Sequence, residues 1–104
     1  MAGNFFENFV IVEIIKSYYN IGELRPPIYF YRDKEKREID LIIEQNGKLY
    51  PIEIKKSANP TKEMIKNFKV LENIKEVGEG AIICMYDKVI NLDEKNFVIP
   101  YKYL

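Results

Sequence analysis

The chain has 104 residues, of which 47% are hydrophobic, enough for one globular domain with a modest single core. Its 16 basic and 16 acidic residues cancel, so no overall positive charge favours nucleic acid, and a binding surface would depend on local separation of charge. Because histidine is absent, Ser-His-Asp catalysis is excluded, and a metal site would need oxygen ligands, which suit Mg²⁺ or Mn²⁺ better than zinc.

The first predicted element is an amphipathic helix over residues 4–20, with Asn4 as its N-cap and Gly22 just past its end. Glu7 falls within the apolar stripe of this helix and is expected to face the rest of the fold. It could instead be a first-turn acid that complements the helix dipole or closes a capping box. Glu13 is followed by Lys16 at i+3 and belongs to a solvated face.

Three strands follow, at residues 28–32, 38–44 and 48–56, and they should form an antiparallel meander. The Asn46-Gly47 dipeptide between the last two is a strong signal for a tight hairpin. A second helix is then expected after Pro60, with Asn59 as its cap. Its apolar face would comprise Met64, Ile65, Phe68, Leu71 and Ile74, and Gly78 and Gly80 would close it.

The apolar run at residues 81–85 is predicted to be a buried strand, followed by a short strand at 89–90 and an extended tail at 97–100. A strand, a helix and a strand in succession form a right-handed crossover, so strands 48–56 and 81–85 should be parallel neighbours. The predicted fold class is therefore α/β, in the order α-β-β-β-α-β, with a mixed central sheet flanked by helices in a single domain.

Two acids and a lysine lie on the predicted hairpin among apolar neighbours. Asp40 and Glu53 are about equally far from the Asn46-Gly47 turn, so their carboxylates should be close across the strands, and Lys55 shares a face with Glu53. Two adjacent carboxylates repel unless a cation lies between them, and a hard divalent ion fits that role. The alternative is an ordinary salt-bridged rim of the sheet.

Lysines form a second pattern. Lys62, Lys66 and Lys69 fall at i, i+4 and i+7 of the second predicted helix, soon after Lys56. A basic stripe beside an acidic pocket would suit a phosphate backbone, so these four lysines are candidate nucleic-acid-binding residues. A solvated helix face explains the helical lysines equally well.

The ordered set Gly3-x-x-Phe6-Glu7, Glu38-Ile39-Asp40 and Glu53-Ile54-Lys55 resembles the dispersed motif of the PD-(D/E)-x-K nuclease superfamily, which includes Holliday-junction resolvases. The wider pattern is most similar to the nuclease-like domain of unknown function that follows the ATPase module in archaeal and bacterial AAA-type ATPases. Two further segments carry that likeness, 29–32 and 50–55. The proline that names the motif is absent, since Ile39 precedes Asp40.

This resemblance implies a restriction-endonuclease-like fold in which Glu7, Asp40 and Glu53 bind Mg²⁺ or Mn²⁺ and Lys55 assists the attacking water. The expected function is a metal-dependent DNA endonuclease-type domain that hydrolyses phosphodiesters. The alternative is a catalytically silent recognition or regulatory module of an AAA-type ATPase that binds DNA or a protein partner.

Expected partners are DNA, including branched DNA, an ATPase module of which this chain would be the excised C-terminal domain, and a second copy of the chain in a homodimer. The single Cys84 lies in an apolar run and should be a buried free thiol, which favours a reducing compartment. Neither a membrane span nor a signal peptide is recognisable, so a cytoplasmic location without membrane contact is expected.

Overall fold

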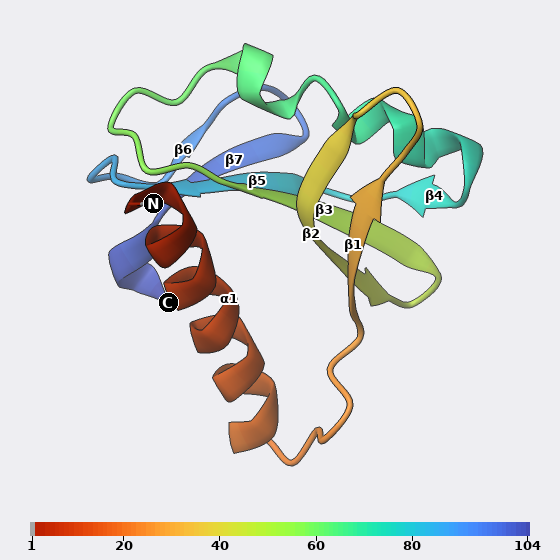
Figure 1. The fold of residues 1–104 in the computed structure, drawn as a ribbon, viewed down its shortest axis with the longest axis horizontal. Coiled ribbons are helices and arrows are strands. Elements are labelled where there is room, and N and C mark those ends of the chain that lie inside the picture. Colours follow the sequence, from red (N-terminus) through yellow and green to blue (C-terminus); the bar gives the residue numbers. More distant parts are fainter. Residues whose placement is uncertain (1) are drawn as a thin grey trace.

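A seven-stranded mixed sheet dominates the computed structural model, which describes residues 2–104, with side chains from Phe5 onward. The strands lie in the order β1-β2-β3-β5-β7-β6. The short β4 pairs with the start of β3, on the same edge of β3 as β5. One α-helix, α1, packs on one face of the sheet beside the C-terminal 3₁₀ turn, and the two 3₁₀ helices between β3 and β4 cover the other face (Figure 1). The coarse prediction of a mixed α/β fold with a mixed sheet is therefore confirmed.

Helix α1 spans Ala2–Asn20. It begins before Asn4, so the prediction that Asn4 is the N-cap was wrong. Its end was predicted correctly, because Gly22 adopts φ +88° and donates a hydrogen bond from its N–H to Tyr19 O at 2.9 Å. Val10 and Ile14 are buried against the sheet, as their helical spacing requires.

The predicted meander is present as β1 (Ile28–Arg32), β2 (Glu38–Gln45) and β3 (Lys48–Ile54), all antiparallel. The turn between β2 and β3 has positive φ at both central residues, 53° at Asn46 and 77° at Gly47. That geometry matches the twist of the flanking strands and fixes their register.

A β-bulge interrupts β2 at a position that the sequence pattern does not reveal. Tyr29 pairs with Ile42 but Tyr31 pairs with Ile39, so one residue of β1 faces both Asp40 and Leu41. Because of the extra residue, the side chains of β2 do not alternate strictly between the two faces of the sheet. Ile39 and Ile42 consequently face one core and Leu41 faces the other.

The predicted second α-helix is wrong. The segment forms two 3₁₀ helices, η1 (Lys62–Ile65) and η2 (Phe68–Asn73), and the residue before η1 is Thr61, so Asn59 and Pro60 do not start a helix. The buried residues Ile65, Phe68 and Leu71 are three apart, which suits the three residues per turn of a 3₁₀ helix better than the 3.6 of an α-helix. Ile74, expected on the buried face, is 58% exposed.

Gly78 and Gly80 do not close a helix, contrary to prediction. They flank the connection from β4 (Glu76–Val77) to β5 (Gly80–Cys84). A Cβ atom at Gly78 would lie 2.4 Å from the Tyr50 ring, and one at Gly80 would lie 2.4 Å from Asn96 Oδ1, so both positions require close backbone approach.

The predicted parallel pairing of the third strand with the apolar strand is confirmed, since Ile52 of β3 pairs with Ala81 of β5. The expected extended tail is a sheet strand, β7 (Asn96–Pro100), which runs parallel to β5 and antiparallel to β6 (Ile90–Asn91), and a last turn, η3, covers Tyr101–Tyr103. The observed order therefore replaces the second α of α-β-β-β-α-β with two 3₁₀ helices and adds β4 before β5.

Apolar side chains form a separate core on each face of the sheet. Cys84 belongs to the core on the side of η1 and η2 and is a buried free thiol, as predicted. Among residues 2–104, no helix is long and apolar enough to cross a membrane. The core beneath α1 contains Phe6, Val10, Ile14, Leu41, Ile52, Ile54 and Ile83.

Candidate functional site

Asp40 and Glu53 are cross-strand neighbours, as the hairpin turn predicts. Leu41 of β2 lies opposite Ile52 of β3, so the next positions outward in this antiparallel pair are Asp40 and Glu53. The predicted proximity is confirmed, and the metal and catalytic roles of these two residues stay predictions.

The bulge in β2 gives Asp40 a particular backbone partner. Its Oδ2 accepts a hydrogen bond from the N–H of Ile54 on β3 at 2.8 Å. The Asp40 side chain thus binds a backbone N–H of the neighbouring strand. This contact lies beside the bulge, where the hydrogen-bond ladder between β1 and β2 is disrupted. This contact fixes the Asp40 carboxylate over the end of β3.

Glu53 is the one charged residue with a buried side chain in the part of the chain that the structure describes, at 5% exposure. Its Oε2 lies 3.5 Å from the Nζ atom of Lys55, which is itself partly exposed. Burial raises the pKa of Glu53 to about 8, with a further contribution from the negative charge of Asp40, while Lys55 acts in the opposite direction. Without a ligand, Glu53 therefore holds a proton near neutral pH.

Glu7 joins the two strand acids from α1. Partial burial raises its pKa, and the charge of Asp40 and hydrogen bonding to Asp40 raise it further. Asp40 thus lies between Glu7 on one side and Glu53 on the other. Glu13 was predicted to be solvated, and it forms a surface ion pair with Lys16 at 3.2 Å.

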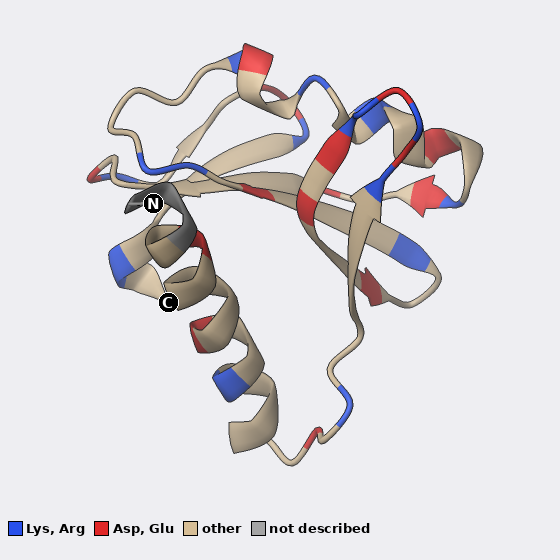
Figure 2. Ribbon diagram, viewed as in Figure 1, with Lys and Arg blue, Asp and Glu red and all other residues tan. Residues whose placement is uncertain are grey.

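An open hollow of about 340 Å³ lies over Asp40, Glu53 and Lys55, a volume that would admit a phosphodiester group. Its other wall is η1 and the two residues after it, Lys66 and Asn67. The Asn67 side chain donates to Glu38 O at 3.2 Å, which ties this wall to β2. Figure 2 shows the acidic positions of β2 and β3 next to one another, with basic positions in the β1–β2 turn and after β3. We call this hollow the acid site.

The donor chemistry of the acid site fits a hard divalent cation. Asp40 and Glu53 present carboxylate oxygens in contact, and a cation there would replace the proton that Glu53 otherwise holds. Asp40 and Glu53 provide a pair of ligands for such a cation and not a complete coordination shell. Among the described residues, no group of three or more Asp, Glu, His or Cys side chains is arranged to hold a metal ion as it stands. Glu7 would have to move toward the pair to become a third ligand.

The predicted nucleic-acid lysines do not lie on one helix face. Lys66 lines the acid site, while Lys62 and Lys69 line a neighbouring hollow beside η1 and η2, and all three are exposed. Lys56 is exposed and lies just past β3. Sequence reasoning missed Lys95, which reaches the same neighbouring hollow from the β6–β7 turn. No periodic pattern connects Lys95 to the other lysines, so only the sheet order could have found it.

The fold and the acid site together define a mixed α/β domain with two interacting carboxyl groups at a strand bulge. The chain belongs to a family whose model matches residues 2–104 and is described as a domain of unknown function, DUF4143. Searches of curated proteins and of solved structures gave no significant match.

Proposed function

We propose that this domain is a metal-dependent DNA endonuclease-type hydrolase of phosphodiester bonds. The observation that carries the proposal is the contact of Asp40 with Glu53 across β2 and β3, with Lys55 Nζ 3.5 Å from the Glu53 carboxyl group. A buried acid beside a second acid is unfavourable for folding, and binding a cation that the reaction needs would account for it. The resemblance to the PD-(D/E)-x-K nucleases and the restriction-endonuclease-like fold that it implies belong to the same proposal.

In this mechanism Asp40 and Glu53, with Glu7 on α1 as a third candidate ligand, would hold Mg²⁺ or Mn²⁺. The bound ion supplies stabilisation of the negative charge that develops on the phosphoryl oxygens. Lys55 lies at the open end of the acid site, partly exposed, where its ammonium group can orient the attacking water or contact the phosphate. Ile54 N–H holds the Asp40 carboxylate in place, in a position where it would be able to bind a cation.

The test is DNA cleavage by the purified chain with Mn²⁺, on linear and branched substrates. Nicking is expected, and Glu53→Ala or Lys55→Ala should abolish it. Glu13→Ala is the matched control, because Glu13 forms only an exposed ion pair with Lys16 and should not affect the reaction. Cleavage that persists in either site variant, with contaminating nuclease excluded, contradicts the proposal.

A second candidate is a catalytically silent module of an AAA-type ATPase that binds DNA or a protein partner. The observation that favours it is the outer face of α1, where large apolar side chains are at least half exposed. An α-helix that is apolar on its solvent face as well as its inner face is typical of a surface that another protein covers. The residues of this outer face are Phe5, Phe9, Val12 and Tyr19.

Folded protein that neither binds millimolar Mg²⁺ or Mn²⁺ nor cuts DNA would favour the module over the hydrolase. In that case Phe5→Ser on the outer face of α1 should leave the isolated domain folded, because Phe5 is 77% exposed. It should weaken association with the ATPase module, measured by co-purification, whereas the exposed polar control Asn8→Ser should not.

A further inference from the structure

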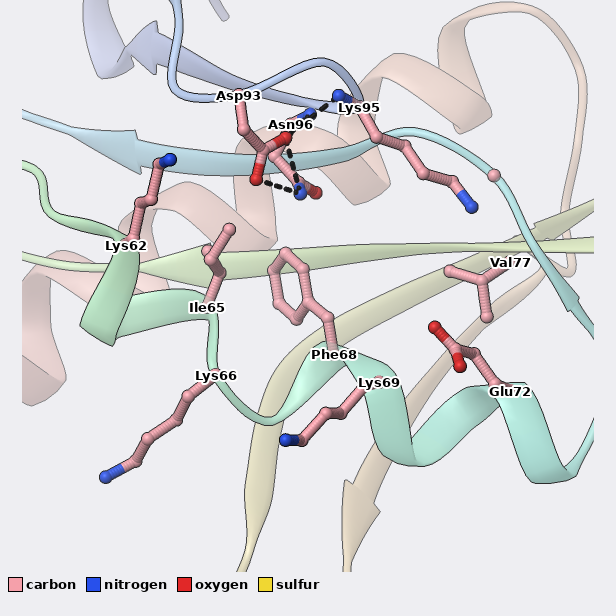
Figure 3. A pocket seen from close by; sticks show the side chains of 11 residues that line it. Lys62, Ile65, Lys66, Phe68, Lys69, Glu72, Val77, Asp93, Lys95 and Asn96 are labelled. Carbon is pink, nitrogen blue, oxygen red and sulfur yellow. Dashed lines mark hydrogen bonds between the residues drawn. The ribbon is translucent and has the colours of Figure 1, made fainter.

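A second hollow adjoins the acid site, and its lining is richer in lysine: four lysines and two acids line it, against three lysines and four acids in the acid site. It measures about 320 Å³ and lies between the 3₁₀ helices and the β6–β7 turn (Figure 3). Lys62 and Lys69 extend from η1 and η2, and Lys95 comes from the turn more than twenty residues later. We call this hollow the lysine pocket.

The turn that carries Lys95 is held by its own hydrogen bonds. Asp93 accepts from the backbone N–H of Lys95 at 2.8 Å and of Asn96 at 2.9 Å, and from the Asn96 side-chain amide at 3.0 Å (Figure 3). The Asp93 carboxylate is thus occupied within the turn. Among the described residues, Lys62, Lys69 and Lys95 form no salt bridge, whereas Lys66 pairs with Glu63 at 2.9 Å, and Glu72 is the only other carboxylate that lines the described pocket.

The inner wall of the lysine pocket is apolar. It consists of the partly exposed Val77 and the edges of the buried Ile65 and Phe68. Ammonium groups at the opening and an apolar wall behind them suit a ligand with an anionic part and a flat apolar part. A nucleotide combines a phosphate with a base of that kind.

Lys66 connects the lysine pocket to the acid site, because it lines both hollows. A single strand that occupied both hollows would therefore pass over Lys66. The pocket is far too small for a double helix, so only an unpaired nucleotide fits it.

We propose that the lysine pocket binds one unpaired nucleotide of the DNA, next to the phosphodiester at the acid site. The proposal rests on the proposed function and narrows its substrate to DNA with a single-stranded segment, such as a branch, flap or overhang. Lys62, Lys69 and Lys95, whose ammonium groups point to three different sides of the pocket (Figure 3), supply positive charge along the strand, and the base lies against the wall near Val77.

The test measures binding without cleavage. Glu53→Gln protein in EDTA is titrated against a fluorescent oligothymidine and against a blunt duplex, over a range of salt concentrations. Lys69→Gln and Lys95→Gln should each weaken oligothymidine binding about fivefold at 0.1 M salt and reduce the salt slope by about 0.7. The control Lys88→Gln removes an exposed lysine of the β5–β6 connection, which lines neither hollow, and should change neither quantity.

Lys95→Arg should restore most of the binding, because it keeps the charge. Thymidine monophosphate should shift the NMR methyl signals of Val77, whereas inorganic phosphate should not. Oligothymidine binding unchanged in both glutamine variants overturns the inference, even if the wild-type chain cuts DNA. Equal weakening of the blunt duplex also overturns it. Selective weakening supports the inference even if no cleavage is found, in which case only the proposed hydrolase fails.

Discussion

Asp33 in the β1–β2 turn and Glu53 on β3 are acids in opposite situations. Asp33 accepts hydrogen bonds from Tyr31 Oη at 3.0 Å, from the backbone N–H of Glu35 at 2.9 Å and from Arg37 Nε at 2.8 Å. Partial burial alone would raise its pKa, but the hydrogen bonds from Arg37, Tyr31 and Glu35 outweigh that effect and lower it. For Glu53, burial and the neighbouring Asp40 together raise the pKa to about 8.

The opposite pKa shifts mean that ionised Asp33 supports folding, whereas ionised Glu53 opposes it. A lowered pKa means that the folded state favours the charged form of Asp33, whose ionisation therefore stabilises the fold. A raised pKa means that ionised Glu53 destabilises the fold. The turn around Asp33 is complete without a ligand, whereas a cation at the acid site would relieve the cost of ionising Glu53. The strongest tests of the proposed function therefore change Glu53 and use Asp33 as the reference.

The largest effect on stability is expected from Glu53→Gln in metal-free protein. Since the pKa of Glu53 is about 8 in the folded state and ordinary in the unfolded state, the stability of the wild type falls as pH rises from about 4.5 to 8. Glutamine resembles the protonated acid and should remove this fall. At pH 9 the variant should be more stable by roughly 2–4 kcal/mol, with little difference near pH 4. Chemical unfolding across this pH range checks it, and a variant less stable at pH 9 would show that the acid site is an ordinary salt bridge.

Asp40→Asn should also increase stability at high pH, but by less than Glu53→Gln. The amide oxygen can still accept the hydrogen bond from Ile54 N–H, but the charge beside Glu53 is removed. The pKa of Glu53 should fall only in part, because burial is its first cause. The loss of stability between pH 4.5 and 8 should therefore shrink without disappearing. Titration of the Glu53 side chain by carbon-detected NMR measures this directly, and an unchanged midpoint would contradict the contact.

The reference acid should behave in the opposite way. Asp33→Asn should lower stability at pH 7, and the difference from the wild type should vanish as pH falls below about 4, where Asp33 becomes protonated in the unfolded and then in the folded state. Its control is Glu35→Gln, which alters only an exposed 3.4 Å ion pair with Arg37 and should change the melting temperature very little. Equal effects of the two substitutions would show that the network around Asp33 contributes no more than a surface ion pair.

Local sequence signals predicted that Asp40 and Glu53 lie close together, because the hairpin that joins their strands is local. Asn46 and Gly47 have the positive φ values that their turn type needs, and that turn alone brings Asp40 beside Glu53. Helical phase also selected Glu7 over Glu13 correctly as the acid close to Asp40. The bulge at Asp40 was not predictable, because it depends on how β1 pairs with β2.

The lysine pocket was harder to foresee because distant segments build it. Apolar residues three apart between Ile65 and Leu71 are compatible with an α-helix and with a 3₁₀ helix. Against the sheet that they cover, these residues adopt the tighter 3₁₀ form. Because the segment is 3₁₀ and not α-helical, Lys62 and Lys69 line a pocket instead of lying on one face of an α-helix. Lys95 joins them because β7 lies next to β5 in the sheet, which no local pattern reports.

The central claim is that Asp40 and Glu53 bind a divalent cation, and calorimetric titration with Mn²⁺ or Mg²⁺ tests it most directly. At pH 7, wild-type protein should bind the ion at millimolar or lower concentration and release a proton, because the cation replaces the proton on Glu53. The released proton appears as a heat that differs between buffers of different ionisation enthalpy. Glu53→Gln should abolish binding, and Glu13→Gln should preserve it. A folded wild-type sample that binds no ion at millimolar concentration, or a Glu53→Gln variant that binds as tightly as the wild type, would contradict the account.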